Sequence, residues 1–263
     1  MRPYSRVCLY KRKLSLMSLV VKLGGSIAEN PSALEKIIRG IKEIANGNPF
    51  VLVHGGGKQI TTLLSELGIE TYFVEGERYT DRRTMEIVEM VLSGLVNKQI
   101  TSVLCHMGIK SIGISGRDLG LITTKRRIEL GYVGEIKSVN AEPIKKLLEI
   151  GFTLVLSPVS ETEDGLPCNV NADFVAIEVG KALKTEKLFL FTDVVGILDG
   201  NKNLIPKLDV DKARSLIEKG IIKEGMIPKV KSAISAIDGG VKEVWIGNNL
   251  TQGTVIRGKE DGS

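Results

Sequence analysis

The sequence predicts an α/β protein, a three-layer αβα sandwich built around a largely parallel central sheet. Short apolar runs typical of buried strands alternate along the chain with segments of helical periodicity, and glycine-rich turns join several of them. No linker of disordered composition divides the chain. With 263 residues, of which 43% are hydrophobic, the chain is long enough to bury a core without disulfide or metal staples.

Composition excludes several classes of protein. The three cysteines (Cys8, Cys105 and Cys168) form no C-x-x-C pattern, and the only histidines are His54 and His106. Neither a disulfide framework nor a protein-bound metal site is therefore expected. No stretch approaches the roughly 18 uninterrupted apolar residues of a membrane helix. We expect a cytoplasmic enzyme or binding domain that does not bind membranes.

The charge balance admits several anionic partners. The net charge is +5 and the isoelectric point is near 9.0. A positive charge of this kind would suit binding to nucleic acid, to a nucleotide or to an acidic protein. Aromatic residues make up only 5% of the chain, and no aromatic platform of the RNA-binding type is visible. The sequence favours a nucleotide or an acidic protein over nucleic acid.

Residues 1–16 are basic but do not resemble a signal peptide. The apolar run that follows, 19–21, is interrupted at once by Lys22, and no cleavage site follows an apolar stretch of the required length. Met17 stands directly before this run. Residues 1–16 are predicted to be either a poorly ordered extension or a misassigned start.

In the first part of the chain a strand, a glycine loop and a helix occur twice in succession. Ser32 and Glu35 have the spacing of a capping box at the start of the first helix. Apolar residues at i, i+3, i+4 and i+7 indicate the second helix. The predicted elements are a strand at 19–21, a loop at 22–26, a helix at 32–41, a strand at 50–53, a loop at 54–57 and a helix at 60–67.

The remainder continues the alternation of helices and strands. A helix-to-strand junction at Lys184 and Thr185 is predicted to separate two lobes, 17–184 and 185–263, which share one sheet. Pro228 suits the first turn of a helix, where its missing N–H costs nothing. The predicted elements are a long helix at 80–107, a strand at 111–114, hairpins or loops at 116–139, a helix capped by Asn140, a strand at 153–156, a helix at 171–183, a strand at 188–191, helices at 211–219 and 228–237, and a strand at 241–246.

Two glycine loops, Gly24-Gly25 and Gly55-Gly56-Gly57, each follow an apolar strand and precede a helix. Without β-carbons the backbone can approach a phosphate closely, and the helix N-terminus adds N–H donors. In successive βα units both loops open at the carboxyl edge of the sheet, where open α/β folds bind ligands. Each loop alone is equally consistent with a tight turn. Neither is a P-loop or a dinucleotide fingerprint, so a phosphate-handling enzyme of another type is indicated.

Charged and polar residues stand at three unusual places. Lys22 ends an apolar strand directly before its glycines, and Lys229 lies in the first turn of a helix, where the helix dipole disfavours a cation. Asn169, Asn171 and Asp173 crowd one helix entrance beyond what capping requires. A solvated strand end, an exposed lysine and a simple helix cap are the structural alternatives. A bound anion would explain all three.

Six motifs resemble, in their order and spacing, those of the amino acid kinase family. The resemblance runs from residue 19 to residue 256, and the combination is specific although each motif alone is not. The motifs are VKLGGS at 21–26, VHGGG at 53–57, RYTD at 78–81, NVNAD at 169–173, TDVVGIL at 192–198 and GMIPK at 225–229.

Within this family the motifs are most similar to the branch that transfers the γ-phosphoryl group of ATP to the side-chain carboxylate of N-acetyl-L-glutamate, in arginine biosynthesis. By resemblance, Lys22 and Lys229 flank the transferred group and Asp173 holds both ammonium groups in place. Mg²⁺ is implied as well, held largely by ATP itself. The substrate is then assigned to lobe 17–184, which also dimerises, and ATP to lobe 185–263.

The resemblance also assigns the binding residues. Backbone N–H groups of the glycines face anionic groups, Arg78 binds a substrate carboxylate in bidentate fashion, and Asn169 contacts the other polar groups. The implied substrate-binding residues are Gly56, Gly57, Arg78 and Asn169. The implied phosphate- and ATP-binding residues are Gly24, Gly25, Asp193, Val194, Gly196, Ile197, Leu198, Ile221, Ile222 and Lys223.

Two departures from the family pattern bear on assembly. Members that arginine inhibits carry an N-terminal helix that mediates hexamer formation, whereas only 18 residues precede the first strand here. The resemblance therefore implies a homodimer without arginine feedback. The region after Asn249 is also short where the acetylglutamate branch usually has a further helix.

Alternative functions remain open at this stage. Related kinases act on glutamate or aminoadipate attached to an acidic carrier protein, and the basic runs 82–83 and 125–127 would suit such a partner, or are simply solvated surface. Carbamate and uridylate kinases share the fold, and a non-catalytic nucleotide-binding module would be expected to lack one of the charged residues. Cys168 is interpreted as a packing residue and His54 as the donor or acceptor of a structural hydrogen bond.

Overall fold

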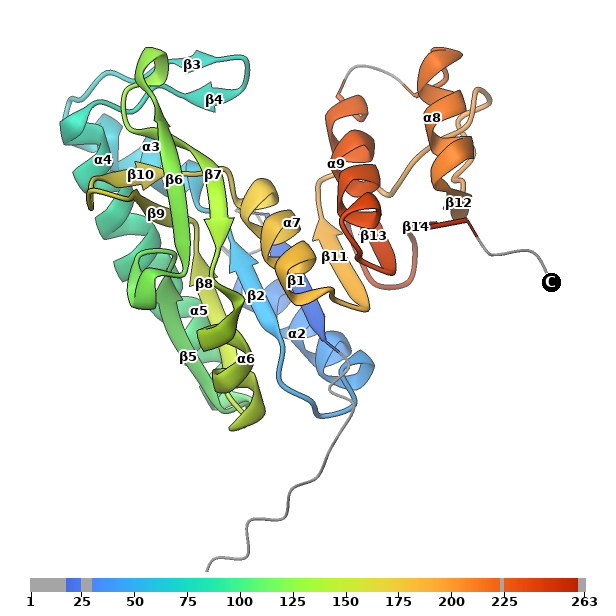
Figure 1. The fold of residues 1–263 in the computed structure, drawn as a ribbon, viewed down its shortest axis with the longest axis horizontal. Coiled ribbons are helices and arrows are strands. Elements are labelled where there is room, and N and C mark those ends of the chain that lie inside the picture. The colour runs from blue at the N-terminus through green and yellow to red at the C-terminus, as the bar shows by residue number, and fades with distance from the viewer. Residues whose placement is uncertain (1–17, 25–29, 223–224, 260–263) are drawn as a thin grey trace, which may run out of the picture.

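A computed structural model describes residues 18–24, 30–222 and 225–259, and an eight-stranded sheet forms its centre (Figure 1). The sheet has the order β12-β14-β13-β11-β1-β2-β8-β5, and only the pairing of β13 with β14 is antiparallel. The strands are β1 (Leu19–Leu23), β2 (Val51–His54), β5 (Ser111–Ser115), β8 (Thr153–Ser157), β11 (Lys187–Phe191), β12 (Lys207–Asp209), β13 (Glu243–Gly247) and β14 (Thr254–Arg257).

Helices cover both faces of this sheet. Successive residues of β1 point to opposite faces, so Val20 packs into one buried cluster and Val21 into the other. This arrangement confirms the three-layer αβα prediction. One face carries α2 (Pro31–Ile44), α3 (Gly57–Glu66), α4 (Arg82–Glu89) and α5 (Asn97–His106), and the other carries α6 (Ala141–Glu149), α7 (Ala172–Leu183), α8 (Val210–Glu218) and α9 (Ile227–Asp238).

A small closed barrel and a hairpin lie beside the main sheet. The predicted hairpin region forms two strands of this barrel, and the two others come from a segment in which the sequence indicated no strands. In Figure 1 the hairpin of β3 and β4 extends over the same end of the molecule as the barrel. The barrel strands are β6 (Ile122–Arg127), β7 (Val133–Val139), β9 (Val159–Thr162) and β10 (Pro167–Asn169), and the hairpin strands are β3 (Phe73–Val74) and β4 (Glu77–Arg78).

The first helix begins earlier than predicted. Asn30 is the N-cap of α2, and its Oδ1 accepts a hydrogen bond from the backbone N–H of Ala33 at 3.1 Å. The capping box expected at Ser32 and Glu35 is therefore wrong. The reason is Pro31, whose fixed φ angle suits the first helical position and moves the cap one residue before it.

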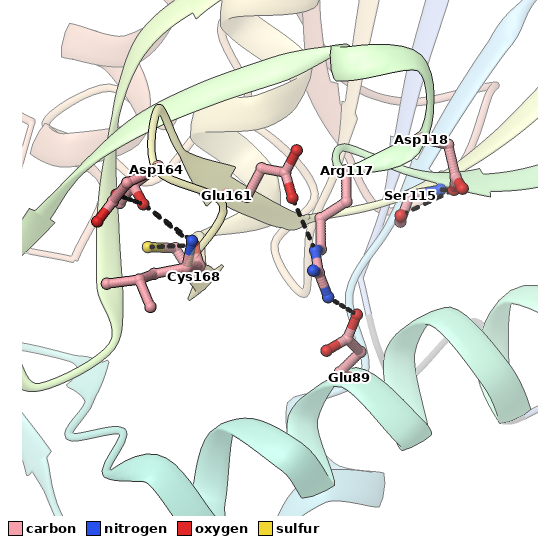
Figure 2. A network of polar contacts seen from close by, with 9 residues as sticks. Glu89, Ser115, Arg117, Asp118, Glu161, Asp164 and Cys168 are labelled. Carbon is pink, nitrogen blue, oxygen red and sulfur yellow. Dashed lines mark hydrogen bonds and ion pairs between the residues drawn. The ribbon is translucent and has the colours of Figure 1, made fainter.

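The predicted long helix contains a π-helical segment. Residues Met90–Val96 form this segment between α4 and α5. At its start Arg117 donates to Glu89 at 2.5 Å and to Glu161 at 3.1 Å, so it ties the helix to β9 (Figure 2). The run Arg82–His106 is long and apolar enough to cross a membrane by length and composition alone. Its buried side chains belong to the core of the sandwich.

Candidate functional site

The parallel strands bring the predicted loops to one edge of the sheet. Lys22 is in register with Leu190 of β11, and Leu23 is in register with His54 of β2. The chain therefore leaves β1, β2 and β11 at the same carboxyl edge, as expected from their parallel order. Three segments that are far apart in the sequence meet there.

A polar cavity of about 240 Å³ opens at this edge. We refer to it as the polar cavity. Residues from β1, the two glycine loops, β4 and β10 surround it, so that the residues predicted to bind substrate come together in space. Among its lining residues are Lys22, Gly24, Gly56, Gly57, Arg78 and Asn169.

The start of α3 presents its backbone to the polar cavity. Gly56 is the N-cap of this helix, and no side chain caps it, so its first N–H groups are available to an anion. A β-carbon at Gly56 would lie 2.6 Å from Cδ2 of Leu92. A larger residue here would have to displace the side chain of Leu92 in the π-helical segment, and Leu92 itself lines the cavity.

Arg78 is buried beside the glycine turn, with only 6% of its surface exposed. Its guanidinium donates to the carbonyl of Gly57 at 3.0 Å and to the hydroxyls of Thr61 and Thr71 at 2.7 and 2.9 Å. It also lies over the ring of Phe73, 4.7 Å from the ring centroid. Burial lowers the pKa of Arg78, but a guanidinium stays charged at any physiological pH. The cavity thus contains a fixed positive charge.

Lys22 and Asp173 form an ion pair of 2.8 Å between β1 and the first turn of α7. Asn171 caps α7 by accepting from the backbone N–H of Asp173, which holds the carboxylate at the helix start. The ammonium of Lys22 also lies 3.5 Å from the carbonyl oxygen of Phe191 at the end of β11. The carboxylate of Asp173 therefore holds this lysine at the edge of the cavity.

Lys229 approaches the same place from the first turn of α9. Its ammonium donates to the hydroxyl of Thr192, the residue that follows β11. The resemblance implied that Asp173 would hold both lysines. The structure records the contact of Asp173 with Lys22 and a threonine partner for Lys229, and nothing in the sequence pointed to Thr192 in that role.

Two further cavities continue from the first. One of about 90 Å³ shares Asn171 with the polar cavity and contains Asp173, Thr192 and Lys229. The other, of about 710 Å³, also contains Lys229, and its walls are mostly apolar. We call this third space the apolar cavity. Of the residues predicted to bind ATP, it is lined by Val194, Gly196, Ile197, Leu198, Ile221 and Ile222.

Some predicted residues lie elsewhere. Asp193 precedes the residues that line the apolar cavity, whereas Gly24 lines the polar cavity instead. Gly25 and Lys223 lie outside the described residues, as does the extension 1–16. The predicted roles of these two residues and the prediction for the extension stay predictions.

The two residues interpreted as structural are both buried. Burial raises the pKa of Cys168, so its thiol is a packing group rather than a nucleophile. His54 is fully buried, and its Nδ1 lies 2.9 Å from the carbonyl oxygen of Gly55. Desolvation lowers the pKa of His54 to about 4, so the ring is neutral at physiological pH. The predicted structural hydrogen bond of His54 is confirmed.

Sequence comparisons agree with this geometry. The sequence profile of the amino acid kinase family matches residues 17–248. The chain is 45% identical to an acetylglutamate kinase of Kosmotoga olearia over 91% of this chain and 86% of the relative. It is also 45% identical to an acetylglutamate kinase of Wolinella succinogenes, over 87% and 82% of the two chains.

A solved structure gives the same result for the fold. The crystal structure of a Streptococcus mutans protein superposes with a TM-score of 0.79 at 29% identity, covering 92% of this chain and 99% of that one. One assignment follows from three observations: the lysines at the carboxyl edge, the glycine turns beside a polar cavity, and a family profile that spans most of the sequence. The chain belongs to the amino acid kinase family.

Proposed function

We propose that this protein is an acetylglutamate kinase, which transfers the γ-phosphoryl group of ATP to the side-chain carboxylate of N-acetyl-L-glutamate in arginine biosynthesis. The observation that carries the proposal is the position of two lysines, Lys22 and Lys229, between a polar cavity and an apolar one. The names of relatives with 40–45% identity over most of the chain support this choice of substrate.

The chemistry required of the site is chiefly electrostatic. A carboxylate and a triphosphate repel each other, and the transition state spreads negative charge over the migrating group. Lys22 and Lys229 supply two positive charges at the junction of the cavities, while Arg78 offers a third at the substrate end. A carboxylate nucleophile is already ionised at neutral pH, so Asp173 positions Lys22 and removes no proton. Positioning and charge stabilisation then account for catalysis.

The nucleotide would occupy the apolar cavity, with its phosphates toward Lys229. Within the described residues no group of three or more His, Cys, Asp or Glu side chains is arranged to hold a metal ion. Mg²⁺ would therefore be bound largely by the phosphate oxygens of ATP. The lining residues support the division into lobes, because the polar cavity uses residues before 173 and the apolar cavity uses residues after 193.

The cellular and quaternary assignments belong to the same proposal. We place the enzyme in the cytoplasm and assign it a homodimeric state. The exposed side chains of Met90 and Leu95 support a dimer, because each keeps more than half of its surface in contact with solvent on the π-helical segment of a core helix. Sedimentation of the purified chain would measure the oligomeric state.

The surface weighs against a carrier-linked substrate. An acidic carrier protein needs an uncompensated basic surface near the site. Arg127 instead pairs with Glu77 and Glu129, and Arg83 pairs with Glu86 at 2.7 Å. These acidic partners neutralise much of the positive charge of the basic runs 82–83 and 125–127.

A substrate panel tests the proposal. Purified protein would be incubated with Mg-ATP and N-acetyl-L-glutamate, glutamate, aspartate or carrier-linked glutamate, and hydroxylamine would trap any acyl phosphate. We expect hydroxamate from free N-acetyl-L-glutamate only. Product from the carrier-linked substrate alone would overturn the proposal, and so would the absence of product from every acceptor.

A further inference from the structure

A buried imidazole lies directly behind the glycine turn of the polar cavity. His54 is the last residue of β2 and is fully buried. Its two ring nitrogens have different neighbours: Nδ1 lies 2.9 Å from the carbonyl oxygen of Gly55, and Nε2 lies 3.2 Å from Nδ2 of Asn97. The roles of the two nitrogens depend on which of them carries the proton, and the surroundings of Asn97 determine this.

The side-chain amide of Asn97 can adopt only one orientation. Its Nδ2 lies 2.9 Å from the carbonyl oxygen of Val155 and 3.2 Å from that of Ile114, and both carbonyls can only accept hydrogen bonds. Its Oδ1 lies 3.1 Å from the ammonium of Lys98, which can only donate. If the amide were flipped, its oxygen would face the two carbonyl oxygens and its NH₂ group would face the ammonium of Lys98, and neither contact could be a hydrogen bond. The NH₂ group therefore faces Val155, Ile114 and His54.

This orientation determines the tautomer of His54. The two hydrogens of this NH₂ group are directed at the two carbonyls, and an amide nitrogen accepts no hydrogen bond, so a proton on Nε2 of His54 would face a group that only donates; Nε2 therefore carries no proton. The single proton of the neutral ring is then on Nδ1, from which it is donated to the carbonyl of Gly55. A cationic ring would direct a second N–H at the amide of Asn97. Burial separately lowers the pKa of His54, so the ring is neutral.

The hydrogen bond from His54 fixes a peptide unit that lines the polar cavity. In a trans peptide the C=O and the N–H point in opposite directions. When the carbonyl of Gly55 faces the imidazole, the N–H of Gly56 is directed away from it. Gly55 itself is held by its own N–H, which donates to the carbonyl of Leu23 at 3.1 Å. The backbone of the turn is thus anchored to β1 and to the imidazole.

We propose that His54 is a positioning residue for substrate binding, whose Nδ1 proton, placed there by Asn97, holds the Gly55–Gly56 peptide with its N–H toward the anionic group of the substrate. The inference rests on the proposed function for the identity of that substrate. His54 touches no reacting atom and transfers no proton. Its effect is to keep one backbone donor ready, so that binding does not have to reorient the turn.

Two substitutions separate this role from simple packing. His54→Leu removes the donor to Gly55, whereas His54→Asn keeps one, because an amide nitrogen attached to Cγ stands where Nδ1 stood. A weakened hydrogen bond to an anion lowers affinity, so we expect the KM for N-acetyl-L-glutamate to rise about tenfold or more in His54→Leu. The KM for ATP should stay within about twofold of wild type, and His54→Asn should recover most of the loss.

Thr153→Val is the matched control. Thr153 is equally buried at the opposite end of the sheet, where its hydroxyl accepts from the backbone N–H of Phe50 at 3.4 Å. This variant should lose stability without a change in either KM. The inference is wrong if His54→Leu and Thr153→Val have the same KM, or if His54→Leu and His54→Asn are equally impaired.

The tautomer can be measured in the unaltered protein, so the test does not depend on a variant that folds. The chain has only two histidines, and His106→Gln assigns their nitrogen resonances in an NMR spectrum of ¹⁵N-histidine-labelled protein. We expect His54 to show a protonated Nδ1 and an unprotonated Nε2 at pH 7. A protonated Nε2 would overturn the inference. This measurement needs no substrate, so failure of the inference is distinguishable from failure of the proposed function, which appears as wild-type protein without kinase activity.

Discussion

The ammonium groups of Lys22 and Lys229 contact consecutive residues at the carboxyl end of β11. Lys22 approaches the carbonyl of Phe191, and Lys229 donates to the hydroxyl of Thr192. Two lysines from opposite ends of the chain therefore lie at the carboxyl end of one strand, and the carboxylate of Asp173 offsets the charge of Lys22. Such an arrangement is favourable for a polyanion, because like charges at short range destabilise the unliganded site.

Removing one of these charges should slow the reaction without affecting the fold. In Lys229→Met we expect kcat to fall about 10²–10³-fold, the usual effect of losing one positioned donor to a transition state. The free energy of unfolding should change little, since Lys229 lies at the start of a helix and at the edge of a cavity. Steady-state kinetics and a urea melt measure both quantities.

The control for this variant is on the same helix. Lys231 is exposed two residues further along α9, so Lys231→Met alters the overall charge equally and should retain wild-type kcat. Equal losses in the two variants would show that general charge, and not the position of Lys229, governs the rate.

Arg78→Lys should weaken substrate binding although the positive charge is kept. The ammonium of lysine cannot reproduce the planar fork with which Arg78 bonds Gly57 and the two threonines. We expect the KM for N-acetyl-L-glutamate to rise about tenfold, the equivalent of roughly 1.4 kcal/mol, with the KM for ATP unchanged. Arg83→Lys, at an exposed ion pair, is the control and should behave as wild type. A parallel rise in both Michaelis constants would contradict the assignment of Arg78 to the substrate.

Gly56→Ala should destabilise the protein because its new methyl group would overlap Leu92. Overpacking of this kind costs about 1–3 kcal/mol in the free energy of unfolding. Gly57→Ala is the matched control, since a β-carbon there meets nothing within 4 Å. The double variant Gly56→Ala, Leu92→Ala should lose less free energy of unfolding than the sum of the losses in the two single variants, because removing the Leu92 side chain makes room for the new methyl group. Additive losses measured by urea unfolding would show that the two residues do not clash.

The stability of the protein should fall as the pH decreases from about 6.5 to 4. The pKa of His54 is lowered from 6.5 to about 4, so in this interval the unfolded chain binds a proton that the folded chain does not. Stability then declines by about 1.4 kcal/mol per pH unit from this group, and the contribution is fully present above pH 6.5. His54→Asn lacks the effect, so the difference in stability between it and wild type should shrink toward pH 4. His106→Gln should follow wild type; a constant difference for His54→Asn would refute the prediction.

Local patterns in the sequence were sufficient for most of the architecture. The alternation of apolar runs and helical stripes identified the strands β1, β2, β8 and β11 and the helices on both faces, because burial of one side of an element leaves a periodic trace. The glycine turns and Lys22 were recognisable for a similar reason: each breaks the local rule for its element. The short strands β3, β4, β9, β10, β12 and β14 were missed, because so few residues leave no clear pattern and each strand is stabilised mainly by pairing with its neighbours.

The sequence by itself determined the layers of the fold, the carboxyl edge as the place of the site and the residue types gathered there. Only the tertiary structure decided that the hydroxyl of Thr192 accepts from Lys229, that the π-helical segment places Leu92 against Gly56, and that the amide of Asn97 lies against Nε2 of His54. These contacts join residues 36 or more positions apart. Such pairs leave no periodic signal, because whether two distant side chains meet depends on the path of the whole chain and on the space that other residues leave.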